Sequence, residues 1–120
     1  MLTMSTKTKR KEFRVRCWLD VGGEKFFGPG RAELLQHIED TGSISQAAKA
    51  MGMSYKKAWA MVDEMNTKAT TPFVIAQKGG QLGGGTELTD AGKKIVKAYG
   101  KLIDRINAVV EKEKDILDLI

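Results

Sequence analysis

The side chains best suited to chemistry on a partner lie in two short stretches, SYKK at residues 54–57 and KGGQLGGG at residues 78–85. Lys56 and Lys57 carry ammonium groups, which can pair with a phosphate or donate to a guanine edge. Glycines lack a Cβ, so the second stretch can approach a sugar-phosphate chain closely, and Lys78 adds a positive charge there. Both stretches indicate binding of a polyanion.

Catalytic chemistry has little support in this sequence. The single histidine, His37, lies beside apolar residues in an expected helix, where a structural role is the simpler interpretation. The single cysteine, Cys17, excludes an internal disulfide, and no His, Cys and carboxylate group has metal-ligand spacing. A nucleotide-binding loop would need Gly-Lys-Ser/Thr entering a helix, whereas Gly85 is followed by Thr86 and Glu87. We therefore expect neither an enzyme nor a bound cofactor.

Composition limits the class of protein and of partner. The chain has 120 residues, 42% of them hydrophobic, and a formal net charge of +5, as expected for one basic domain. A basic body favours nucleic acid, and solubility alone is the alternative. No apolar run reaches membrane-spanning length, so we expect a cytoplasmic chain with no membrane partner. Residues 1–12 are expected to form a flexible basic arm, which either touches phosphates or only aids solubility.

The lysines must be positioned by helices that the spacing of apolar residues predicts. A first helix is expected at residues 31–40. A second helix should begin after a cap at Ser43 or Ser45 and end at Gly52, and a third should cover residues 55–68 after a cap at Ser54. Two helices joined by a glycine turn are typical of a helix-turn-helix, and an ordinary helical hairpin is the alternative. The inner face of the third helix is expected to hold Tyr55, Ala58, Trp59, Val62 and Met65.

Two β-hairpins are expected beside these helices. Alternation in FRVRCWL predicts a strand over residues 13–19, which turns at Gly22-Gly23 and returns over residues 24–27. Residues 73–77 and 86–88 flank the glycine-rich loop and predict a wing, for which a hairpin tip without contacts is the alternative. In a wing, Lys78, Gly79 and Gly80 would lie on the minor-groove or phosphate side.

A long helix is expected after a cap at Thr89. Its apolar residues recur at seven-residue spacing, which is typical of pairing with a second copy of the chain, and folding back onto its own domain is the alternative. The expected dimer contacts are Val96, Tyr99, Ile103, Ile106, Val110 and Leu117.

Residues 30–102 resemble the N-terminal DNA-binding domain of ModE-type regulators, the molybdate-responsive regulators of bacteria. The stretches GSISQAAKAMGMSYKKAWAMVDEMN and GGQLGGGTELTDAG carry the resemblance, and the Gly-Ser-x-x-x-Ala-Ala phrase is similar, more distantly, to LysR-type regulators. The resemblance implies a winged helix-turn-helix dimer with residues 55–68 as the recognition helix and the glycine loop as the wing. These residues hold no counterpart of the oxyanion-binding region of ModE, so no molybdate ligand is implied and the effector is unknown.

The sequence therefore predicts a mainly α protein with small β hairpins (α+β). Residues 1–12 would form the arm, 13–92 the winged helix-turn-helix domain and 93–120 a dimerisation helix. The expected function is a sequence-specific transcriptional regulator that binds double-stranded DNA as a homodimer, and the alternative is a winged-helix protein-interaction or architectural module. The expected DNA contacts are Ser54, Tyr55, Lys56, Lys57, Lys78, Gly79, Gly80, Ser45 and Arg31.

Overall fold

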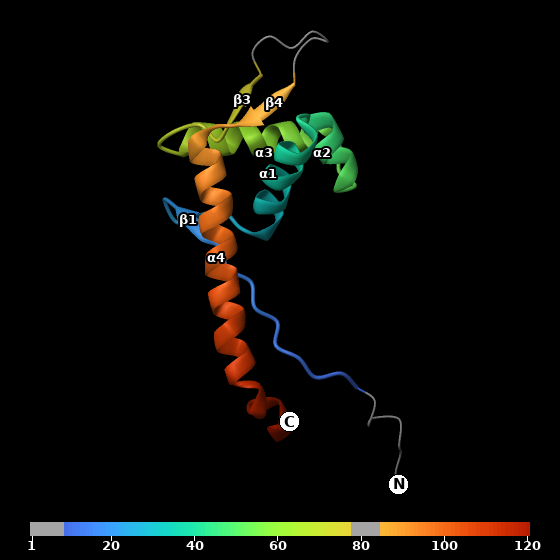
Figure 1. Cartoon of the computed structure of the whole chain (residues 1–120), viewed down its shortest axis with the longest axis vertical. Helices are drawn as coiled ribbons and strands as arrows, with labels where there is room; N and C mark the ends of the chain where they lie inside the picture. The colour runs from blue at the N-terminus through green and yellow to red at the C-terminus, as the bar shows by residue number, and fades with distance from the viewer. Residues whose placement is uncertain (1–8, 78–84) are drawn as a thin grey trace.

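The computed structural model describes residues 9–77 and 85–120, in which four α-helices accompany two small antiparallel hairpins (Figure 1). This arrangement confirms the mainly helical fold class. The molecule measures 68 × 27 × 24 Å, because its last long helix and its N-terminal segment extend away from the helical body. The elements in chain order are β1 (Leu19–Val21), β2 (Glu24–Phe27), α1 (Pro29–Thr41), α2 (Ile44–Ala50), α3 (Tyr55–Lys68), β3 (Val74–Ala76), β4 (Thr86–Leu88), α4 (Asp90–Lys112) and the 3-10 helix η2 (Lys114–Leu119).

Helix ends follow the capping residues in the sequence. Gly42 adopts a left-handed φ of 71° and ends α1. The Ser43 hydroxyl accepts from Gln46 N at 3.0 Å at the start of α2, so Ser43 and not Ser45 is the cap. Gly52, with a φ of 66°, turns the chain before α3. The Ser54 hydroxyl accepts from Lys57 N at 3.1 Å and starts α3 at the predicted residue.

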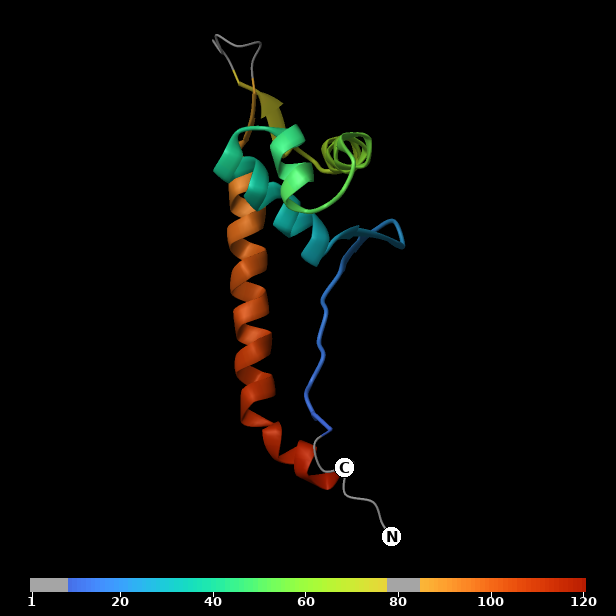
Figure 2. The same cartoon turned by 90° about the vertical axis from the view of Figure 1, so that its right-hand side faces the viewer.

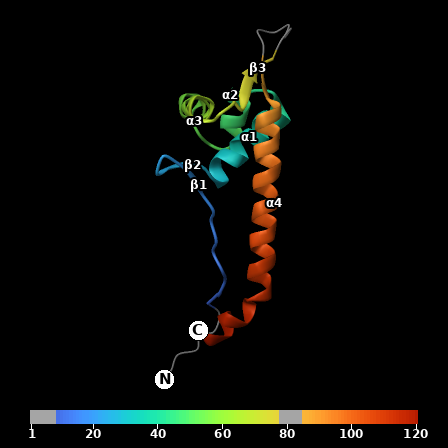
Figure 3. The same cartoon turned by 90° about the vertical axis from the view of Figure 1, so that its left-hand side faces the viewer.

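The core lies where α1 to α3 meet the two hairpins and the first turns of α4. Leu34, Leu35 and Ile38 on α1 are fully buried at its centre. Aromatic rings connect β2 to α4 within this core, because the Phe27 ring packs edge-on against the Tyr99 ring with a centroid distance of 5.3 Å. Figures 2 and 3 show α1 between α3 on one side and α4 on the other, so α3 is left at the periphery of the body.

The predicted first strand is much shorter than expected. β1 covers Leu19–Val21 rather than residues 13–19, and it pairs with β2 across the Gly22-Gly23 turn. The residues that would pair with positions 13–18 begin at Pro29 and form α1, so the hairpin has no partner strand to extend along. Residues 9–18 instead run as an irregular extended segment beside α4.

The predicted inner face of α3 is wrong in two of its members. Ala58, Val62 and Met65 are buried, but Tyr55 and Trp59 are 55% and 50% exposed. Each residue of a helix is rotated by about 100° around the axis from the one before it, so Tyr55 and Trp59 lie to one side of the buried stripe. No other element of the described chain covers them there. They do not anchor α3 to the core.

The C-terminal helix also differs from its prediction. α4 ends at Lys112 and the chain bends into η2, so Leu117 lies outside the long helix. Tyr99 is only 6% exposed, and its hydroxyl donates to the Cys17 carbonyl oxygen at 2.7 Å. Tyr99 therefore belongs to the core of its own chain, and its ring is not available for the predicted dimer contact.

Candidate nucleic-acid interface

The first turn of α3 presents the basic residues that the sequence singled out. Lys56 and Lys57 are both exposed, and within residues 9–77 and 85–120 neither forms an ion pair. The Ser54 cap fixes the backbone of this turn, while Ala58 in the same turn is fully buried. The two ammonium groups are therefore carried by a fixed helix and have no ion-pair partner among the residues that the structure describes.

The root of the wing is fastened to the start of α2. Thr86 N donates to the Gly42 carbonyl oxygen at 2.8 Å, and Gln77 N donates to the Gly85 carbonyl oxygen at 3.0 Å. A Cβ at Gly85 would lie 2.4 Å from the Gly42 oxygen, so only glycine allows this approach. The predicted wing contacts Lys78, Gly79 and Gly80 lie outside the described residues.

Asn66 connects α3 to the wing, and the sequence analysis did not identify it. Its Oδ1 accepts from Phe73 N at 2.8 Å and from Val74 N at 3.1 Å, while its Nδ2 donates to the Val74 carbonyl oxygen at 2.9 Å. The amide thus mimics a strand partner for the first residues of β3. A short polar amide near the end of a helix, a few residues before Pro72 and an apolar strand, was the available sequence signal.

A small hollow brings Ser45 and Tyr55 together at the wing root. It has a volume of about 200 Å³ and lies between the N-terminal ends of α2 and α3 and the start of β4. Its lining residues are Ser43, Ile44, Ser45, Tyr55, Gly85 and Thr86. The helix-turn-helix and the wing therefore share one continuous surface, with the predicted contacts Ser45 and Tyr55 at the junction.

Arg31 does not lie on this surface. Its side chain is 18% exposed, and its guanidinium donates to the Phe26 carbonyl oxygen at 2.7 Å and pairs with Glu64. Lys68 also contacts Glu64, at 3.1 Å, and hydrogen bonds from Arg31 and Lys68 lower the pKa of the Glu64 carboxyl below its ordinary value. Arg31 therefore ties α1 to α3, and we exclude it from the candidate interface.

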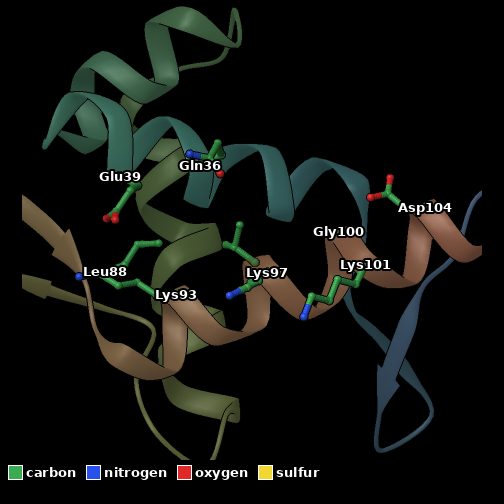
Figure 4. A pocket seen from close by; sticks show the side chains of 9 residues that line it. Gln36, Glu39, Leu88, Lys93, Lys97, Gly100, Lys101 and Asp104 are labelled. Carbon is green, nitrogen blue, oxygen red and sulfur yellow. The ribbon is translucent and has the colours of Figure 1, made fainter.

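A second basic surface, also missed by the sequence analysis, follows the wing along α4. Lys93, Lys97 and Lys101 recur every fourth residue and line an open groove of about 470 Å³ against Gln36 and Glu39 of α1 (Figure 4). None of the three lysines forms an ion pair within the part of the chain that the structure describes. The groove therefore presents three lysines along the first turns of α4, together with the acidic side chains of Glu39 and Asp104.

The described residues show little that would suit a different kind of site. Among residues 9–77 and 85–120, no three His, Cys, Asp or Glu side chains gather as metal ligands. In the same ranges, no helix combines the length and the apolar character needed to cross a bilayer. His37 lies 3.4 Å from Glu33 one turn before it on α1, a surface pair with no further partner for catalysis.

Comparisons with known proteins give this geometry a family. Residues 30–93 match the family model of the bacterial regulatory helix-turn-helix proteins of the LysR family. The chain is 44% identical over 90 residues to the molybdenum transport protein ModE of Azotobacter vinelandii, covering 75% of this chain and 33% of that one. It is 40% identical over 92 residues to the DNA-binding transcriptional dual regulator ModE of Escherichia coli, covering 77% of this chain and 34% of that one. The chain thus spans about a third of the length of these curated relatives.

A solved structure supports the fold. Vibrio fischeri DarR, a LysR-type regulator in complex with DNA, superposes with a TM-score of 0.53 at 17% identity, covering 73% of this chain and 28% of that one. The relatives are regulators rather than enzymes, which confirms the non-enzymatic class. The chain therefore belongs to the LysR-type family of bacterial regulatory helix-turn-helix proteins, in which it is a DNA-binding domain related to the ModE regulators.

Proposed function

We propose that the chain binds double-stranded DNA sequence-specifically as a homodimer, with α3 in the major groove and the wing on the backbone, and so regulates transcription. The observation that carries this proposal is the exposed first turn of α3, where Lys56 and Lys57 form no ion pair within the described chain and directly follow Tyr55, which lines the hollow at the wing root. Basic residues at the start of a recognition helix suit contacts with base edges and flanking phosphates.

The mechanical coupling between α3 and the wing supports the same function. Asn66 fixes the start of β3, and the Gly42–Thr86 bond fixes β4 to the start of α2. A duplex would therefore contact α3 and the wing at a fixed separation. Little conformational entropy would be lost on binding, because the two elements are already held in place. The proposed wing contacts are Lys78, Gly79 and Gly80, and the proposed contacts on the helices are Ser45, Ser54, Tyr55, Lys56 and Lys57.

The proposed homodimer rests on the distal half of α4. Past Ile103, the helix leaves the core of its own protomer, and Val109 is 61% exposed. Val110 continues the seven-residue row of Val96 and Ile103, and Ile106 lies between Ile103 and Val110 on the same face of the helix. An apolar row on a helix that leaves the domain is typical of a helix paired with another copy. A two-fold dimer would present two α3 helices to two half-sites.

Fluorescence anisotropy on duplexes enriched by the protein from a random pool tests the proposal. The variant Lys56→Ala with Lys57→Ala should bind the enriched duplex at least tenfold more weakly than the wild type. The matched control, Lys112→Ala with Lys114→Ala, also removes two positive charges, at the junction of α4 and η2, and should bind nearly as the wild type does. Equal loss in both variants, or no enrichment of any duplex, would favour the protein-interaction alternative.

A further inference from the structure

An unexpected aromatic surface lies on α3 beside the lysines. Tyr55 and Trp59 are one helical turn apart and expose 55% and 50% of their surfaces, and we call this pair the aromatic row. Both rings are large apolar surfaces in contact with water. Exposed apolar patches of this kind usually mark an interaction site. The rings do not support the core, so the fold alone does not explain them.

The direction of the aromatic row follows from Asn66. Asn66 lies seven residues after Trp59 and eleven after Tyr55, so all three share one side of a helix with 3.6 residues per turn. That side faces β3, because the Asn66 amide bonds to Phe73 and Val74. Tyr55 also lines the hollow at the wing root with Gly85 and Thr86. The aromatic row therefore borders the open face of α3 on the side of the wing.

The charges at the N-terminal end of the aromatic row favour nucleic acid as its partner, while the acidic Asp63 lies one turn beyond Trp59 at the other end. Lys56 and Lys57 follow Tyr55 directly and form no ion pair within residues 9–77 and 85–120. A partner that contacts both the lysines and the aromatic rings must offer negative charge next to an apolar surface. In the major groove of DNA, the C5-methyl group of thymine is the apolar group that lies between two rows of phosphates.

We propose that the aromatic row reads thymine, with Trp59 and Tyr55 packing against thymine methyl groups while the lysines hold the flanking phosphates. This inference rests on the proposed DNA binding and adds a source of base preference to it. Lysine pairing with phosphate carries no sequence information, whereas contact with a methyl group distinguishes thymine from the other bases. Burial of one methyl group corresponds to about a fourfold change in Kd.

Replacement of thymine by uracil tests the inference, because it removes only the methyl group. The probe is the duplex that the wild type enriches from a random pool, made with each thymine replaced in turn. The wild type should bind about fourfold more weakly at one or more positions, and the double variant Tyr55→Ala with Trp59→Ala should bind the thymine and uracil forms of those positions equally. Tyr55→Phe, which removes only a hydroxyl, is the matched control and should keep the thymine preference.

Three outcomes would overturn the inference. Two results would overturn the reading of thymine and leave DNA binding intact: a wild type whose affinity is unchanged by uracil at every position, or a double variant Tyr55→Ala with Trp59→Ala that keeps the full thymine preference. A failure to enrich any duplex would overturn the proposed function as well. Thermal melting checks that each variant is folded at the temperature of the binding assay, since about half of each ring is buried.

A second measurement uses the unaltered protein and does not depend on the folding of a variant. 5-Bromouracil places a bromine where thymine has its methyl group and forms crosslinks to adjacent aromatic rings when irradiated. In duplexes substituted at the uracil-sensitive positions, the crosslinked peptide should contain Tyr55 or Trp59 by mass spectrometry. Crosslinks confined to peptides outside α3, or none at all, would overturn the proposal.

Discussion

Asn66 should contribute strongly to stability although no sequence motif identifies it. The Asn66→Ala change removes three hydrogen bonds of 2.8, 2.9 and 3.1 Å and leaves two amide groups and one carbonyl at the start of β3 without their partner. A hydrogen bond contributes about 1 kcal/mol to folding, and the site is half-buried, so we expect a loss of about 2–3 kcal/mol. For a domain of this size, that corresponds to a fall in Tm of roughly 10 °C.

Urea denaturation followed by circular dichroism measures this loss, with the protein concentration held constant because a dimer makes stability concentration-dependent. Asn66→Asp keeps the two bonds in which the side chain accepts but loses the bond that it donates to Val74. Its free energy of unfolding should therefore lie between those of Asn66→Ala and the wild type. Asn107→Ala is the matched control, since Asn107 is exposed on α4 and makes no side-chain bond within the described chain. A loss below about 0.5 kcal/mol for Asn66→Ala would refute the role assigned to this amide.

Three further predictions concern charge, pH and assembly. Replacing both Lys56 and Lys57 by Ala should reduce the slope of log K against log salt by about 2, measured by anisotropy, and an unchanged slope would mean that neither meets phosphate. The pKa of Glu64 is lowered by its two basic partners, so its contribution to stability is present above the ordinary value of 4.5 and is lost as the pH falls through the lowered pKa. Urea titrations between pH 6 and pH 3 should therefore show a smaller pH-dependent loss in Glu64→Gln, and identical profiles would contradict the ion pair. Val110→Asp should shift the chain from dimer to monomer in analytical ultracentrifugation without loss of helicity, whereas an unchanged dimer would place the interface elsewhere.

Local signals in the sequence predicted most of the secondary structure. Ser54, Gly42 and Thr89 act at helix ends through groups one to four residues away, so their roles are visible without knowledge of the fold. The start and end of α3 and the bounds of β2 and β4 were predicted to the residue for the same reason. The short loops between these elements also left few alternative arrangements.

The parts that sequence reasoning missed depend on distant partners. FRVRCWL alternates as a strand does, but it stays irregular because no strand lies beside it. Helical spacing placed Trp59 on the inner face of α3, but the folded structure leaves half of its surface exposed. Arg31 was predicted to contact DNA, and its partner Glu64 lies 33 residues away. Local pattern cannot distinguish a half-buried ion pair from a free cation.

The central claim is that α3 enters the major groove of a duplex, and methylation interference tests it most directly. Guanine N7 lies in the major groove, so its methylation should prevent binding to the enriched duplex at two symmetric clusters. The account predicts that these clusters lie about one helical turn apart or a multiple of it, as two α3 helices of a dimer require. Binding that tolerates methylation at every guanine N7 while adenine N3 methylation in the minor groove abolishes it would contradict the account.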